Sequence, residues 1–278
     1  TIANGLNSGI LYLMVCPYIL IVSGLIWTYY KENQSINSWF MALILCLETS
    51  SKNCSVSICK DNHVLFFKEY YDKNYCHGEK LHVLIQSLLA ESNISIHDFD
   101  AFAYSSGPGS YTGLRIGAAS IKGFSYALEK PAISISTLKS MASGLLMTGF
   151  DFQNNGLLCP VIDSRKDEIY AALYDVRLNE FLSPFACDLL SFSFLEYLEN
   201  HTVYFFGTGL YKLQNIKHKN AVFLHDKMPS SRDLACLAED AFNSHNFEDV
   251  AYFEPTYLKD FIPTKSKKSI NNIWLIIY

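Results

Sequence analysis

The sequence predicts an α/β protein made of two lobes of related design. Apolar strand patterns with short polar breaks are followed by helical periodicity, and this succession occurs twice along the 278 residues. The two successions open alike, with a strand, a turn and a hairpin partner around Ile44 and again around Val161. The second succession is weaker, so a single domain of two packed layers is the alternative.

The first half is expected to open with a three-stranded antiparallel meander. A helix should follow, because apolar side chains recur at helical spacing from Leu81 to Leu89. A strand, a glycine-rich turn, a helix, a further strand or turn and another helix complete this half. In order, these elements are expected at 42–50, 53–59, 64–71, 78–91, 101–106, 112–128, 133–137 and 139–147.

The second half is expected to repeat this order in reduced form. A buried strand and its hairpin partner open it, and a short helix and a strand follow. The last helix carries Leu234, Leu237 and Ala238 on one face, behind serine caps. These elements are expected at 156–163, 168–176, 191–200, 202–209 and 230–245.

Composition narrows the class of protein. Apolar residues make up 50% and charged residues 18%, which suits a large core and excludes general disorder. The net charge of -5 excludes a broadly basic nucleic-acid surface. The 8 cysteines are scattered without a C-x-x-C pair, so we expect reduced thiols in a cytoplasmic protein. His77 and His82 lack the i, i+4 spacing of two ligands on one helix face, so no metal site is expected.

The two ends differ from the middle of the chain. Residues 10–30 carry no charge and are long enough to cross a bilayer, so a membrane anchor is one hypothesis. Against it, Pro17 and Gly24 interrupt the stretch and no basic region precedes it. We expect residues 1–40 to be an apolar extension outside the native domain, without membrane association. The tail at 263–278 is given no function.

Glycines cluster where the strand at 101–106 meets the next helix, in the segment GPGSYTGLRIG from Gly107 to Gly117. Glycine permits tight turns and close backbone approach, and a helix N-terminus attracts anions. The spacing fits neither a Walker A loop, whose lysine is missing, nor G-x-G-x-x-G. A tight structural turn is therefore favoured over phosphate binding.

Other strand ends carry residue types that some phosphotransferases use to hold Mg²⁺ and a nucleotide tail. Glu48 ends the first strand beside a turn without glycine, where side chains would crowd a phosphate, so a surface turn is favoured. Asp163 and Arg165 end a strand of the second lobe and are candidates to face a cleft, although most such charge clusters are solvated. No nucleophile with a neighbouring base is recognisable, so no catalytic residue is assigned. The candidate vestigial nucleotide-binding residues are Glu48, Ser50, Gly107, Gly109, Gly113, Gly207 and Gly209.

Seven segments together resemble one known family. GPGSYTGLRIG is similar to the GPGSFTGLRIG of the TsaB family, formerly called YeaZ, the bacterial partners of TsaD in making threonylcarbamoyladenosine in tRNA. The resemblance runs from Met41 to about Lys268. The supporting segments are LETSSKNCSVSI (47–58), HGEKLHVLIQSLL (77–89), ISTLKSMA (135–142), IDSRKDEIY (162–170), FGTG (206–209) and EPTYLKDF (254–261).

The resemblance implies the two-lobed ASKHA fold of actin and Hsp70 in a reduced form. Lobe I would comprise residues 41–146, with 230–262 returning to it, and lobe II would comprise 147–229. In the family, TsaD carries the metal-binding histidines and the group transfer, and TsaE hydrolyses ATP. The resemblance therefore implies a scaffold that activates its partner without catalysis of its own.

The implied partners are a TsaD-like paralogue, a TsaE-like ATPase and, as a fallback state, a second copy of the chain. The resemblance implies that tRNA is reached only through the complex. No cofactor is assigned to the chain itself, and ATP or ADP is expected at most at a partner interface. The family docks on TsaD with its first two helices, which maps the interface onto Leu81, Leu84, Ile85, Leu88, Leu114, Ile121 and Phe124, some of which must also serve the core.

Two other functions remain as alternatives. The first is a nucleotide-dependent ATPase or kinase-like enzyme that uses Glu48 and the glycine-bearing strand ends as its cleft. The second is a peptidase, because relatives were once classed as glycoproteases. No nucleophile dyad or metal triad supports the peptidase.

Overall fold

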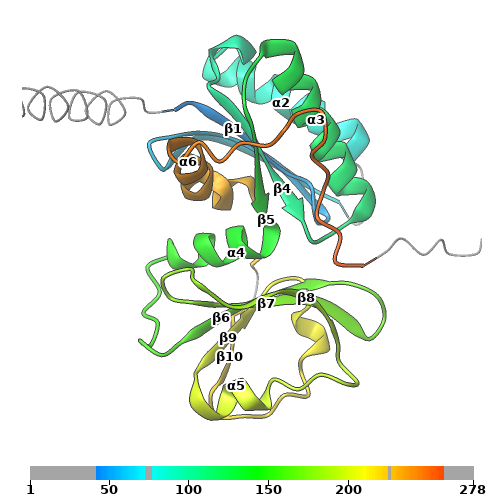
Figure 1. Cartoon of the computed structure of the whole chain (residues 1–278), viewed down its shortest axis with the longest axis vertical. Coiled ribbons are helices and arrows are strands. Elements are labelled where there is room, and N and C mark those ends of the chain that lie inside the picture. The colour runs from blue at the N-terminus through cyan, green and yellow to red at the C-terminus, as the bar shows by residue number, and fades with distance from the viewer. Residues whose placement is uncertain (1–41, 73–76, 225–226, 260–278) are drawn as a thin grey trace, which may run out of the picture.

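The computed structural model describes residues 42–72, 77–224 and 227–259, which form two α/β lobes stacked one above the other (Figure 1). The expected extension at 1–40 and the tail at 263–278 lie outside the described residues. Within the described part, no helix combines the length and the apolar character that a membrane crossing requires.

The first lobe contains a five-stranded sheet in the order β3-β2-β1-β4-β5. The expected meander is confirmed, because β1, β2 and β3 pair antiparallel, while β4 and β5 extend the sheet parallel to β1. Leu47 lies opposite Val56 in the β1–β2 register, and both side chains enter the same apolar core. The strands are β1 (Ile44–Glu48), β2 (Asn53–Lys60), β3 (His63–Tyr71), β4 (Ala101–Gly107) and β5 (Ala132–Ser136).

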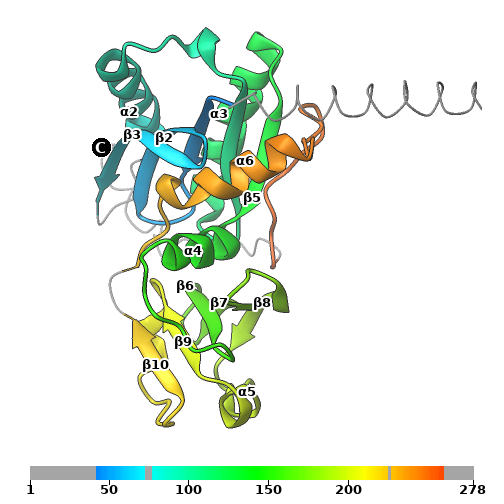
Figure 2. The same cartoon turned by 90° about the vertical axis from the view of Figure 1, so that its left-hand side faces the viewer.

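Helices cover both faces of this sheet (Figures 1 and 2). Helices α2 (His77–Ser92) and α3 (Tyr111–Leu128) lie on one face and α6 (Ala235–Asn243) on the other. Helix α3 begins at Ser110, whose Oγ accepts a hydrogen bond from Gly113 N at 3.3 Å. This cap satisfies one of the amides that a helix start leaves without an intrahelical partner.

The second lobe repeats the sheet of the first. Its order is β10-β9-β6-β7-β8, so β6 occupies the central place of β1, β7 and β8 continue antiparallel, and β9 and β10 lie parallel to β6. The repeat is reduced, because a short 3-10 turn at Leu210–Lys212 stands where the first lobe has α3. The remaining elements are β6 (Leu157–Asp163), β7 (Glu168–Asp175), β8 (Glu180–Asp188), α5 (Leu195–Asn200), β9 (Val203–Phe206) and β10 (Ala221–Leu224).

The last helix of each repeat packs on the sheet of the other lobe. Helix α4 (Thr137–Leu146) follows β5 but lies between the lobes (Figure 2), and its buried Leu138 and Met141 join a cluster with side chains of the second sheet. Helix α6 follows β10 and packs Ala235 and Ala238 against the first sheet. The expected boundary at residue 146 places α4 in lobe I. In the structure, the buried apolar side chains of α4 pack with side chains of lobe II.

Candidate functional site

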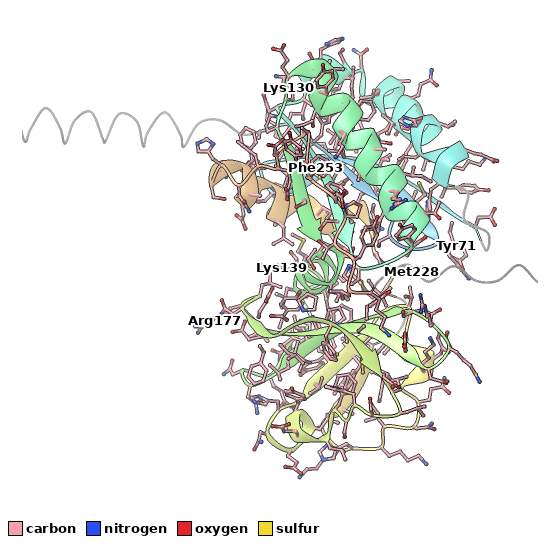
Figure 3. All side chains as sticks on the ribbon, turned by 45° about the vertical axis from the view of Figure 1, so that its right-hand side comes forward. Tyr71, Lys130, Lys139, Arg177, Met228 and Phe253 are labelled. Carbon is pink, nitrogen blue, oxygen red and sulfur yellow. The ribbon has the colours of Figure 1, made fainter. Side chains whose placement is uncertain are left out.

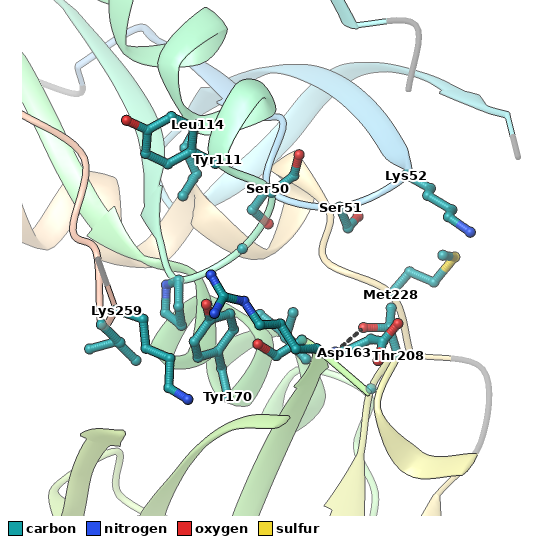
Figure 4. A pocket seen from close by; sticks show the side chains of 18 of the residues that line it. Ser50, Ser51, Lys52, Tyr111, Leu114, Asp163, Tyr170, Thr208, Met228 and Lys259 are labelled. Atoms are coloured by element: carbon teal, nitrogen blue, oxygen red, sulfur yellow. Dashed lines mark hydrogen bonds between the residues drawn. The ribbon is translucent and has the colours of Figure 1, made fainter. Parts of the chain in front are cut away.

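A cleft of about 820 Å³ opens between the two lobes (Figure 4). Lobe I contributes the turn after β1 and the N-terminus of α3, and lobe II contributes the ends of β6 and β9. Tyr71 and Met228 lie near each other at the boundary between the lobes (Figure 3), and both line the cleft. We call residues 253–259, which run along lobe I to the cleft mouth, the C-terminal strap.

The N-terminus of α3 presses against the turn after β1. Thr49 Oγ1 donates a hydrogen bond to the Gly113 carbonyl oxygen at 2.8 Å, and Ser110 N donates to the Ser50 carbonyl oxygen at 2.6 Å. A Cβ on Gly109 would lie 2.6 Å from the Ser50 Cβ, and one on Gly117 would lie 2.5 Å from Thr49 Oγ1. Gly109 and Gly117 thus allow the start of α3 to pack closely against the turn after β1. The sequence had favoured such a structural role for the glycines over phosphate binding.

Glu48 lies beneath this turn and does not line the cleft. Its carboxyl group is fully buried, Oε1 accepts a hydrogen bond from Ser50 N at 2.6 Å, and Oε2 has no hydrogen-bond partner among the described residues. Desolvation raises the pKa of Glu48, while hydrogen bonds from Ser50 and Ser105 oppose that shift. A buried carboxyl group under a filled turn does not fit an Mg²⁺–nucleotide complex, which needs a carboxylate facing the cleft.

The lobe II wall is organised around Asp163 at the end of β6. Lys212 Nζ lies 2.6 Å from Asp163 Oδ1, the Tyr211 hydroxyl donates to the same oxygen at 2.9 Å, and Asp163 N donates to Thr208 Oγ1 at 3.0 Å. Gly207 has φ +118° and leaves no room for a Cβ beside the Val161 carbonyl oxygen, so glycine is required at this strand end. The wall is therefore a fixed polar network.

The C-terminal strap joins the two walls. Thr256 N donates a hydrogen bond to the Ser106 carbonyl oxygen at 2.7 Å, which fixes the strap to the end of β4. The ring of Tyr257 lies 4.9 Å from the ring of Tyr111. Lys259 Nζ then reaches lobe II, 2.5 Å from Glu168 Oε1.

The structure distributes the candidate nucleotide-binding residues over two environments. Ser50, Gly109 and Gly207 line the cleft, as do Asp163 and Arg165. The other four candidates lie at the neighbouring turns and do not line the cleft: Glu48, Gly107, Gly113 and Gly209.

Most of the expected docking residues belong to the core of lobe I. Leu81, Leu88 and Ile121 have 0% exposure, Leu114 has 1% and Ile85 has 4%. Two further positions, Leu84 and Phe124, are half-buried and pack against the same core. The exposed faces of α2 and α3 are formed by other residues, described below.

Sequence reasoning missed two parts of the cleft. The side chains of Tyr211 and Tyr257 line it, although no spacing pattern marks either residue. Tyr257 falls within EPTYLKDF, a segment quoted for its resemblance alone, and this was the one signal that pointed to the strap.

The two lobes have the same strand order, a cleft lies between them, and the last helix of each repeat packs on the sheet of the other lobe. This arrangement defines an ASKHA protein, the actin-like class, in reduced form. The family model described as TsaD, tRNA N6-adenosine threonylcarbamoyltransferase, matches residues 73–262. Together with the relatives described next, this match shows that the chain belongs to the TsaB/YeaZ family.

Individual relatives agree with this assignment. The chain is 28% identical over 232 residues to the tRNA threonylcarbamoyladenosine biosynthesis protein TsaB of Escherichia coli, a match that covers 80% of this chain and 96% of that one. The TsaB of Haemophilus influenzae is 25% identical over 233 residues, with 80% and 95% covered. The structure of YeaZ from Pseudomonas aeruginosa superposes with a TM-score of 0.66 at 23% identity, covering 78% of this chain and 100% of that one, which shows a shared fold.

Proposed function

We propose that this chain takes part in forming threonylcarbamoyladenosine in tRNA, as a non-catalytic subunit that binds and activates a TsaD-like partner. The names of the TsaB relatives, matched over nearly their whole length, support the pathway. The observation that carries the non-catalytic role is the turn after β1, which α3 fills where an active member of the fold class would hold a nucleotide tail.

The side-chain chemistry of the described residues agrees with a scaffold. Glu48 is buried with a raised pKa and does not face the cleft. Within residues 42–72, 77–224 and 227–259, no three His, Cys, Asp or Glu side chains converge as a set of metal ligands. The burial of Glu48 away from the cleft supports a division of labour in which the partner carries out the transfer and a TsaE-like ATPase hydrolyses ATP.

The proposed docking face is the exposed side of α2 and α3. Val83 is 57% exposed on α2, and Tyr126 is 83% exposed on α3. The small residues Ala119 and Gly123 of α3 are also exposed, and a Cβ on Gly123 would meet nothing within 4 Å. Small residues allow a second helix pair to approach closely, so the equivalent pair of a paralogue would complete a four-helix bundle here.

The same face would join two copies of the chain when the partner is absent, because a twofold axis brings one surface against itself. We place both the homodimer and the complex with the TsaD-like partner in the cytoplasm, as expected for a tRNA-modifying protein with reduced thiols.

Reconstitution of tRNA modification tests the proposal. The TsaD-like paralogue, the ATPase, the threonylcarbamoyl donor and unmodified tRNA are incubated with and without this chain, and modified adenosine is measured by mass spectrometry of the nucleosides. We expect modification to require the chain, and the chain alone to hydrolyse no ATP. Modification at the same rate without it would contradict the proposed function, and brisk ATP turnover by the chain alone would favour the kinase-like alternative.

A further inference from the structure

Each wall of the cleft presents one exposed tyrosine ring that is held by hydrogen bonding. Tyr211 on the lobe II wall is 57% exposed, and its hydroxyl donates to Asp163 Oδ1 at 2.9 Å. Tyr257 on the strap is 36% exposed, and its hydroxyl accepts from Arg115 Nε at 3.2 Å. Rings fixed in this way lose little freedom when a planar group stacks on them.

Each wall also carries a cation that has no ion-pair partner in the described part of the chain. Lys52 follows the turn after β1, Arg165 follows β6, and both are exposed at the cleft. The lysines at 212, 227 and 259 are already paired with carboxylates. Figure 4 shows Lys52 and Lys259 on opposite sides of the opening. In a chain of net charge -5, two unpaired cations make the cleft a local site for anions.

The arrangement distinguishes between kinds of anion. A free triphosphate is usually bound by clustered backbone amides, but here the amides of Ser50 and Ser110 already donate to protein oxygens. Cations and tyrosine rings on both walls instead match a strand, in which bases and phosphates alternate.

We propose that the cleft binds a nucleotide of a single-stranded RNA segment. The base stacks on Tyr211 or Tyr257, and the flanking phosphates contact Arg165 and Lys52. This inference rests on the proposed function in tRNA modification, and it adds a direct RNA contact where the family resemblance implies contact only through the complex.

Fluorescence anisotropy with the full chain and a labelled anticodon stem–loop RNA tests this inference. Tyr211→Leu should weaken RNA binding about fivefold or more, because stacking on one base is lost. Arg165→Gln should lower the slope of log K against log salt by about 0.7, the value for one phosphate contact with a single strand. The matched controls are Tyr252→Leu, at a residue that is 82% exposed outside the cleft lining, and Lys166→Gln, in the same hairpin as Arg165.

The controls should bind the RNA like the wild-type chain. Equal binding by Tyr211→Leu, Arg165→Gln and the wild type would overturn the inference, as would equal losses in the controls. If AMP binds more tightly than the RNA and shows the same dependence on Tyr211, the cleft takes free nucleotides and the RNA assignment is wrong.

The modification assay separates this inference from the proposed function. If the wild-type chain promotes modification while both cleft variants bind RNA normally, only the RNA contact is overturned. If the wild-type chain binds RNA through the cleft but modification does not require it, only the proposed function is overturned.

Discussion

Gly113 lies against Thr49, and this contact explains why the glycine-rich segment is a packing device. Thr49 Oγ1 donates to the Gly113 carbonyl oxygen at 2.8 Å, and a Cβ on Gly113 would collide with the Thr49 carbonyl oxygen. Helix α3 therefore approaches the turn after β1 to a distance that only glycine permits. The same contact explains the glycine at position 113 by packing, without a bound phosphate.

Gly113→Ala should destabilise the chain by about 1–3 kcal/mol, because the added methyl group must displace backbone atoms of the turn. The control is Gly123→Ala on the same helix, where the added Cβ meets nothing within 4 Å. Alanine is the better helix former, so this variant should be more stable by about 1 kcal/mol. Chemical denaturation measures both, and equal stabilities of the two variants would contradict the close contact.

Glu48→Gln should change how the stability of the chain depends on pH. Burial raises the pKa of Glu48 in the folded state above the ordinary value of a glutamate, so the folded state binds a proton more readily than the unfolded state. Stability from this group is therefore fully present below the unfolded pKa and is lost as pH rises through the folded value. Asp233 and Glu239 also have raised pKa values because of desolvation, so the difference between variant and wild type is the useful quantity.

We expect Glu48→Gln to remove part of the stability loss as pH rises above the ordinary pKa of a glutamate, because the amide is neutral throughout and its oxygen can accept from Ser50 N. Urea denaturation at a series of pH values measures this. A variant that loses stability as steeply as the wild type over that range would show that Glu48 is not the buried titrating group.

ATP should bind weakly to the chain alone. The amides of Ser50 and Ser110 already donate to protein oxygens, so neither of them is available to a phosphate. Isothermal titration calorimetry with Mg²⁺–ATP should give no saturable heat at micromolar concentrations. Micromolar affinity would show that the turn opens, and would restore the kinase-like alternative.

Ile121→Ala should destabilise the isolated chain by about 2–5 kcal/mol, because Ile121 has 0% exposure in the core of lobe I. Val83→Ala, on the exposed side of α2, should change stability by less than about 0.5 kcal/mol. Thermal or chemical denaturation distinguishes the two. Equal effects would mean that Ile121 is a surface residue, as its assignment to the interface implied.

Helical periodicity predicted α2 well, and α3 was expected after the glycine-rich turn, but neither signal could predict the docking face of the two helices. The pattern from Leu81 to Leu88 marks the side that is buried, and in the structure that side contacts the lobe's own sheet. A docking face of small and isolated apolar residues, such as Ala119 and Tyr126, leaves no periodic signal. The interface expected from the resemblance therefore fell largely on core residues.

Two strands escaped the sequence analysis for physical reasons. Strand β8 lies at a sheet edge, contains Pro184 and has a single buried residue, Cys187, so it lacks the alternation of a strand with one buried face. Strand β10 is an edge strand of four residues, Ala221–Leu224. It is too short for the alternation of apolar and polar residues to be recognised in the sequence. The cleft was predicted in part from strand ends such as Asp163, whereas the strap reaches it from a distant part of the chain.

Calorimetric titration of the TsaD-like paralogue with the full chain tests the central claim most directly. The wild-type chain should bind, and Val83→Glu should weaken binding about tenfold or more, because a charge enters the proposed apolar docking face. Leu190→Glu, at a residue of lobe II that is 85% exposed, is the control and should bind like the wild type. Unchanged affinity of the folded Val83→Glu variant would contradict docking through α2 and α3.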